Sequence, residues 1–265
     1  MRRRLRSPGD FARWSSRCES VRSRIRSALL ASLCWLGCGV SSRDAPAPAT
    51  DEYAELRARM VREQLVARGI RDPRVLAVMG RVPRHELVPE RARGEAYEDG
   101  PLPIGEGQTI SQPYIVAAMS EAAALKGDER VLEVGTGSGY QAAVLSALAR
   151  EVYTIELEPV LAARAKRDLE RLGCTNVHTR TGDGYRGWPE AAPFDAILVT
   201  AAPDHVPPDL LEQLKVGGRL VIPVGGGYDQ ELWLYTKTER GVERKHLMPV
   251  RFVPLRGEGE KRNDR

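Results

Sequence analysis

Three glycines and three carboxylates have the residue types and spacing to do chemistry. Gly135, Gly137 and Gly139 lie between an expected strand and an expected helix. Glycines permit a tight turn and let a ligand approach the backbone without a Cβ in the way, and the following helix offers free N–H groups at its start. On its own such a turn is weak evidence, because it could bind a dinucleotide or only allow close packing.

Three acidic residues near strand ends sharpen this interpretation. Glu133 comes just before the glycines, Glu156 ends the next expected strand, and Asp183, followed by Gly184, comes after the third. Ligands of open α/β sheets bind outside the carboxyl ends of the strands, where all three acids are expected. A carboxylate at Glu156 can accept hydrogen bonds from two ribose hydroxyls. One at Asp183 can accept from an exocyclic amine such as that of adenine.

The spacing of the glycines points to a particular class of ligand. It reads GxGxG, whereas dinucleotide-binding turns read GxGxxG, and no arginine stands out as a pyrophosphate ligand. A ligand with adenine and ribose but no phosphate fits better. We therefore predict S-adenosyl-L-methionine as the cofactor, with NAD or a purely structural turn as the alternatives. The predicted cofactor contacts are Glu133, Gly135, Gly137, Gly139, Glu156, Asp183 and Gly184.

From residue 131 onward, strand-like and helix-like segments alternate. Strands are expected at 131–134, 152–155, 177–180, 194–200 and 219–222, followed by a closing pair at 231–236 and 245–252. Helices are expected to about 149, from 159 to 173 and from 207 to 214. The alternation predicts an α/β fold with a doubly wound, mainly parallel sheet. The closing pair predicts an antiparallel C-terminal edge.

The segment before the sheet reads as an N-terminal extension of helices and loops. Helices are expected over 51–69 and, with an aspartate cap and a proline at its start, over 72–79. Residues 94–112 read as an irregular loop, and a loop this long in a compact domain is usually functional. A helix is expected over 113–125, with Gly127 as its stop.

Residues 1–50 read as a basic leader outside the folded body. Ten arginines and two acids in residues 1–43 give +8, and the remaining 30 basic and 34 acidic residues give −4, which recovers the total of +4. The order of basic, apolar and small residues resembles a secretory signal, and Cys38 hints at lipid attachment. A disordered extension and a mis-assigned start are the alternatives. Residues 51–265 are expected to form one domain, with helices and substrate loop in 51–126 and the cofactor-binding sheet in 127–265.

Composition argues against several classes of protein. The apolar fraction of 42% is enough for a sizeable core, and no run reaches the roughly 20 apolar residues of a membrane span. The four cysteines and four histidines show neither a disulfide framework nor metal-ligand spacing, so no metal site is predicted. The mildly acidic body argues against a broad nucleic-acid-binding surface.

Several segments together resemble the protein-L-isoaspartate O-methyltransferase family. In family order they are Pro101 to Tyr114, Val131 to Tyr140, Gly182 to Gly184, Phe194 to Ala202, and Arg251 to Leu255. The glycine motif would fit most methyltransferases, whereas Gly107-Gln-Thr-Ile-Ser-Gln-Pro113 is much narrower and carries the resemblance. The leader has no counterpart in the usual family pattern.

The resemblance implies a Rossmann-like, S-adenosylmethionine-dependent methyltransferase. Such an enzyme methylates the free α-carboxyl group of isoaspartyl residues in damaged proteins and so initiates their repair. The active-site serine of the family corresponds to Ser111. The implied partners are isoaspartyl-containing proteins and peptides, with no nucleic acid, no stable membrane span and a monomeric state. We expect a cytoplasmic location, because the methyl donor is made from ATP inside cells, with export or lipid anchoring through the leader as the alternative.

Other interpretations stay open at the level of the sequence. The chain could be a methyltransferase for a small molecule or RNA, a nicotinamide-dependent oxidoreductase, or a non-catalytic S-adenosylmethionine-binding module. Ser111 could also cap the helix that begins near Pro113, a role that serine often fills.

Overall fold

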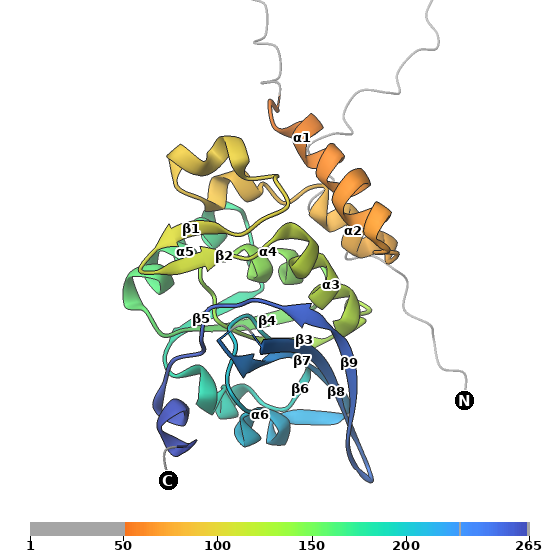
Figure 1. Ribbon diagram of the computed structural model, residues 1–265, viewed down its shortest axis with the longest axis vertical. Helices are drawn as coiled ribbons and strands as arrows, with labels where there is room; N and C mark the ends of the chain where they lie inside the picture. The colour runs from red at the N-terminus through yellow and green to blue at the C-terminus, as the bar shows by residue number, and fades with distance from the viewer. Residues whose placement is uncertain (1–50, 228, 264–265) are drawn as a thin grey trace, which may run out of the picture. The chain divides into compact units, whose positions relative to one another are not determined.

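The computed structural model describes residues 51–227 and 229–263. The leader predicted for residues 1–50, with its signal and lipid-attachment alternatives, lies outside this part of the chain. The described part contains a seven-stranded sheet and a separate two-stranded hairpin (Figure 1).

The seven-stranded sheet is mainly parallel and has the order β5-β4-β3-β6-β7-β8-β9. The pairs among β3 to β7 are parallel, and β8 and β9 add in antiparallel fashion. The predicted α/β sheet with an antiparallel C-terminal edge is therefore confirmed. The strands are Arg130–Val134 (β3), Glu151–Glu156 (β4), Val177–Thr181 (β5), Phe194–Val199 (β6), Leu214–Gly226 (β7), Asp229–Thr238 (β8) and Gly241–Val250 (β9).

Helices cover both faces of the sheet. Successive strand residues point to opposite sides, so apolar side chains of one strand are buried on both faces. Val131 belongs to a core that β3 shares with α3, α4 and α5, whereas its neighbour Leu132 belongs to a second core shared with η5, η6 and α6. Figure 1 shows α6 on the opposite side of the sheet from α3 and α4. These elements are Pro113–Ala123 (α3), Tyr140–Ser146 (α4), Pro159–Arg171 (α5), Gly184–Arg186 (η5), Pro189–Ala191 (η6) and Pro208–Glu212 (α6).

The N-terminal extension is helical, as predicted. The first helix, α1 (Ala54–Arg59), continues through the π-helical η1 (Met60–Leu65) and the 3-10 turn η2 (Val66–Arg68) to Gly69, whose φ is 93°. The next helix, α2 (Pro73–Met79), is capped by Asp72, which accepts a hydrogen bond from the Arg74 N–H (2.8 Å). Two 3-10 segments, η3 (Arg84–Leu87) and η4 (Glu90–Glu95), follow, and η7 (Glu258–Asn263) lies near the C-terminus.

Two local predictions are wrong. Residues 94–112 do not form an irregular loop, because they contain a β-hairpin made of β1 (Leu102–Gly105) and β2 (Gln108–Ile110). Alternate side chains of β1 are buried. The turn between the two strands has positive φ angles at three successive residues, 105–107. Helix α3 ends before the predicted stop at Gly127, since Ala124 already adopts a left-handed conformation (φ 48°).

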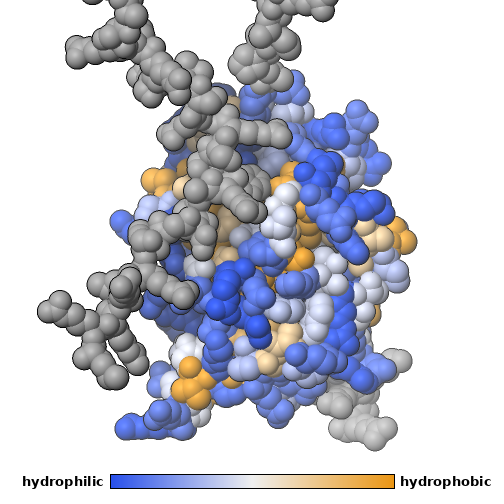
Figure 2. Space-filling view, turned by 180° about the vertical axis from the view of Figure 1, so that it is seen from behind, coloured by the Kyte–Doolittle hydropathy of each residue, from blue (hydrophilic) through white to orange (hydrophobic). Residues whose placement is uncertain are grey.

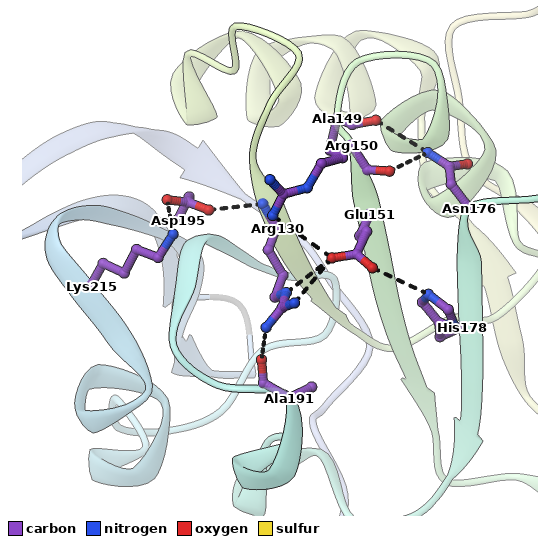
Figure 3. A network of polar contacts seen from close by, with 9 residues as sticks. All are labelled: Arg130, Ala149, Arg150, Glu151, Asn176, His178, Ala191, Asp195 and Lys215. Carbon is purple, nitrogen blue, oxygen red and sulfur yellow. Dashed lines mark hydrogen bonds and ion pairs between the residues drawn. The ribbon is translucent and has the colours of Figure 1, made fainter.

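A polar network joins the N-terminal ends of the parallel strands (Figure 3). Asp195 of β6 accepts hydrogen bonds from the Arg130 N–H (2.8 Å) and from Lys215 Nζ (2.6 Å). The Arg130 guanidinium pairs with Glu151 of β4 (3.1 Å) and donates to the carbonyl oxygen of Ala191 (3.0 Å). Hydrogen bonds and ion pairs thus close this end of the sheet, which lies opposite the carboxyl ends of the strands.

Asp195→Ala is expected to lower the free energy of unfolding by about 1–3 kcal/mol at pH 7, because the Arg130 N–H loses its acceptor. Burial by itself raises the pKa of Asp195, but the hydrogen bonds from Arg130 and Lys215 outweigh it and hold the pKa below its ordinary value of 3.8. The stabilisation is therefore present above that ordinary value and is lost as the pH falls through the lower pKa of the folded state.

Urea unfolding of both proteins at pH 7 and at low pH measures this effect, and the difference between them should shrink at low pH. Glu243→Ala on β9, where the side chain is exposed, is the matched control and should change stability little. A difference of the same size at both pH values would contradict the prediction.

Candidate functional site

A pocket lies at the carboxyl ends of β3, β4 and β6, and the order of the strands reverses at β3 and β6. It is open to solvent and contains about 780 Å³ of empty space. Its main walls are residues 108–111 of the hairpin and the loop after it, 133–138, 155–158, and 253–256 near the C-terminus. Ligands of open α/β sheets bind at this position.

The glycine-rich turn forms the floor of the pocket. The N–H groups of Gly135 and Thr136 both donate to the carbonyl oxygen of Ile155 (2.8 and 3.1 Å). Gly135 has a φ of 100°, and a Cβ at this position would lie 2.6 Å from Thr200 Oγ1, so only glycine fits. Gly135 and Gly137 line the pocket. Gly139 does not line it and packs against Leu169 of α5 instead.

Glu156 lines the pocket beside this turn and is almost completely buried. Its Oε2 accepts a hydrogen bond from the Gly137 N–H (2.7 Å), and its Oε1 accepts one from the Glu158 N–H (3.0 Å). Two backbone groups therefore fix the orientation of the carboxylate. Because each carboxylate oxygen has more than one lone pair, both remain able to accept from a diol.

Glu133 lies deeper in the pocket and is fully buried. Its Oε2 accepts a hydrogen bond from Thr154 Oγ1 (2.5 Å), and Thr136 Oγ1 lies 2.6 Å from the same hydroxyl. Its Oε1 has no hydrogen-bond partner in the described part of the chain. Burial raises the pKa of Glu133 to about 8.

Asp183 and Gly184 follow β5, as predicted, but only Gly184 lines the pocket. Asp183 caps η5, accepting a hydrogen bond from the Tyr185 N–H (2.9 Å), and its second oxygen accepts from the Glu258 N–H (2.8 Å). A Cβ on Gly184 would collide with Val134 Cγ1, so this residue must be small. The carboxylate of Asp183 thus holds the C-terminal segment at the edge of the cleft.

Ser111 lines the pocket from the junction of β2 and α3 and is half-buried. The N-cap position of α3 is taken by Gln112, and no side chain makes a capping hydrogen bond there. The alternative interpretation of Ser111 as a helix cap is therefore wrong. Ser111 lines the same cavity as Glu133 and Glu156, which lie 22 and 45 positions further along the chain.

Three polar residues of the pocket region were not among the predicted site residues, although one of them, Thr136, lies within the glycine motif. Thr154 is paired in register with Glu133, and Thr136 and Gln141 line the cavity. A signal exists for Thr154 and Gln141, because each is a polar residue inside an otherwise apolar strand or helix. Within the described ranges no group of three or more His, Cys, Asp or Glu side chains could hold a metal ion.

Comparisons with known proteins point to one family. The family model described as protein-L-isoaspartate(D-aspartate) O-methyltransferase matches residues 56–260. A protein-L-isoaspartate O-methyltransferase of Synechococcus sp. (strain JA-2-3B'a(2-13)) is 58% identical over 217 residues, which cover 79% of this chain and 89% of the relative. One from Opitutus terrae is 62% identical over 200 residues, which cover 75% and 86%.

Two solved structures of the same description have a similar fold. A protein-L-isoaspartate O-methyltransferase aligns with a TM-score of 0.69 and 32% identity, over 76% of this chain and 66% of that chain. A Plasmodium falciparum structure named for the same enzyme, in complex with S-adenosyl-L-homocysteine, aligns with a TM-score of 0.66 and 28% identity, over 76% and 98%.

The raised pKa of Glu133 predicts a pH-dependent effect of Glu133→Gln on stability. Between the ordinary value of 4.5 and about 8, the glutamate is ionised in the unfolded chain but protonated in the folded one. The wild-type protein therefore loses stability as the pH rises through this window, whereas a glutamine at this position does not titrate. Relative to wild type, Glu133→Gln should be more stabilising at pH 8 than at pH 5 in thermal unfolding of the ligand-free protein.

The exposed Glu243→Gln is the matched control and should change stability little. A Glu133→Gln effect that stays constant between pH 5 and pH 8 would show that the buried carboxyl group does not titrate in this window.

Proposed function

Because the chain belongs to the protein-L-isoaspartate(D-aspartate) O-methyltransferase family, we propose that its cleft transfers a methyl group from S-adenosylmethionine to the free α-carboxylate of isoaspartyl residues in damaged proteins. One observation supports this proposal above all: Ser111, Glu133 and Glu156 line the same cavity. The narrow motif around Ser111 and the general cofactor-binding motif thus line the same cavity.

The chain supplies a matching environment for the adenosyl part of the donor. The backbone turn at Gly135 and Gly137 leaves room for close approach, and Glu156 presents an oriented carboxylate to the ribose hydroxyls. Gly184 contributes a wall without a side chain. Asp183 stays a candidate for the adenine amine, although both of its oxygens already accept a backbone hydrogen bond.

The chemistry needs positioning more than proton transfer. An α-carboxyl group has a pKa of roughly 3.5 and is already ionised at neutral pH, so no strong base is required. A carboxylate oxygen attacks the sulfonium methyl carbon, the new C–O bond forms as the C–S bond breaks, and the electron pair stays on sulfur. Alignment of the two bound reactants can lower such a barrier by roughly 7–11 kcal/mol.

Ser111 is the residue we assign to the substrate carboxylate. Ser111 is half-buried, lines the cavity and does not occupy the N-cap position of α3, so we propose that its hydroxyl donates a hydrogen bond to the substrate. We expect Ser111 to hold the carboxylate in line with the methyl group rather than to exchange a proton.

Ser111→Ala should therefore lower kcat by about tenfold or more while leaving the affinity for S-adenosylhomocysteine unchanged. The assay uses labelled donor and two peptides that differ only in an Asp or isoAsp linkage, with isothermal titration for the affinity. Ser146→Ala, at the far end of α4, is the matched serine control. Label appearing on both peptides or on neither would defeat the proposed substrate, and unchanged turnover would remove Ser111 from the reaction.

We also propose a cytoplasmic, monomeric enzyme that does not act on nucleic acids. Among residues 51–227 and 229–263 there is no helix with the length and apolar character of a membrane span. Hydrophilic residues dominate the face in Figure 2. The large exposed apolar side chains are spread over η2, the turn after β4, α5, β7 and β9: Val66, Leu157, Val160, Val216 and Val242.

Mass spectrometry of the protein from its native cells tests the location, because a cytoplasmic enzyme should keep residues before Cys38 and carry no lipid. An N-terminus at Cys38 with an attached lipid, or one further along the chain created by signal cleavage, would overturn the cytoplasmic proposal. Light scattering during gel filtration tests the monomeric state.

A further inference from the structure

Gln141 holds a buried amide whose orientation is determined by its neighbours. Its Nε2 donates a hydrogen bond to Ser120 Oγ (2.9 Å), and Ser120 Oγ donates to the carbonyl oxygen of Val116 (2.8 Å). A hydroxyl has a single hydrogen, so Ser120 Oγ can only accept from Gln141. The NH₂ group of Gln141 must therefore face Ser120, and its Oε1 is the free end of the amide.

That free oxygen is buried and has no hydrogen-bond partner in the described part of the chain. Gln141 is 6% exposed and lines the same pocket as Ser111 and Glu156. A buried carbonyl oxygen without a donor is costly, and buried polar groups are normally paired. The arrangement is explained if a bound molecule supplies the missing donor.

A second buried oxygen without a partner belongs to another residue that lines the pocket. Glu133 Oε1 is also buried without a partner, and the backbone N–H of Ala142, the residue after Gln141, lies close enough to the Glu133 carboxyl group to affect its pKa. Glu133 and Gln141 thus line one pocket, and each has a buried oxygen without a hydrogen-bond partner in the described part of the chain.

The chemistry of these two oxygens suits a cation with several hydrogens. An ammonium group has three donors and no acceptor, so it can donate to more than one oxygen. A substrate carboxylate has no hydrogen to donate to these oxygens, and we assign it to Ser111 instead. Resting on the proposed function, we propose that Gln141 Oε1 accepts a hydrogen bond from the α-ammonium group of S-adenosylmethionine and thereby positions the methionine part of the methyl donor.

The test compares two ligands that differ in the amino-acid part. S-adenosylhomocysteine carries the α-ammonium group, whereas 5′-methylthioadenosine keeps the adenosine and sulfur but lacks it. Gln141→Leu keeps a similar volume and removes the acceptor. Titration calorimetry should show about tenfold or greater loss of affinity for S-adenosylhomocysteine, as expected for a hydrogen bond to a charged group, and a change of less than about twofold for 5′-methylthioadenosine.

Gln64→Leu is the matched control. Gln64 also has a buried Oε1 without a partner, and its Nε2 donates to the carbonyl oxygen of Tyr97, but it does not line the pocket. This variant should bind both ligands as the wild type does. If Gln141→Leu does not fold, Gln141→Met gives the same comparison with an unbranched side chain.

An equal loss of affinity for both ligands, or no loss for either, would overturn the proposal. A raised KM for the isoaspartyl peptide with unchanged affinity for S-adenosylhomocysteine would also overturn it, because Gln141 would then bind the substrate. Since the calorimetry uses no peptide, a failure of the isoaspartyl substrate assay leaves this result readable on its own.

Discussion

The cleft depends on how the turn at residues 135–139 is held between the ends of two neighbouring strands. From β4, the carbonyl oxygen of Ile155 accepts two hydrogen bonds from the turn, and Glu156 accepts a third. From the end of β6, Thr200 Oγ1 donates to the carbonyl oxygen of Gly135 (2.6 Å). A side chain at position 135 would displace Thr200 and loosen this clamp, so the positions of Glu133 and Glu156 follow from the absence of a Cβ at one residue.

The two ends of the parallel strands serve opposite purposes. At the N-terminal ends, ion pairs and hydrogen bonds connect four residues: Arg130, Glu151, Asp195 and Lys215 (Figure 3). At the carboxyl ends, the chain leaves buried acceptors without donors, which lowers the stability of the ligand-free protein. Buried groups that lower the stability of the ligand-free protein are typical of functional sites. The polar network at the N-terminal ends contributes free energy of folding that offsets part of this cost at the carboxyl ends.

The sequence predicts those features that are decided by local backbone chemistry. The alternation of strands and helices, the cap at Asp72, the stop at Gly69 and the antiparallel edge were all recoverable, because each is specified by neighbouring residues. The hairpin was missed because its strands are four and three residues long and its turn resembles a loop. The free oxygen of Gln141 could not be predicted, since it depends on Ser120 from a different helix.

The proposed reaction needs no acid or base among the residues of the cleft, because the isoaspartyl α-carboxyl group is already ionised at neutral pH. In our proposal, Gln141 accepts a hydrogen bond from the cation and Ser111 donates one to the anion, so that residues of one cavity orient both reactants. Methyl transfer joins a sulfonium and a carboxylate and leaves a neutral thioether and a neutral ester. A buried site strengthens the attraction between the reacting charges and removes water that would otherwise reorganise. Burial therefore favours the chemical step, and the same burial is what raises the pKa of Glu133 in the absence of a cation beside it.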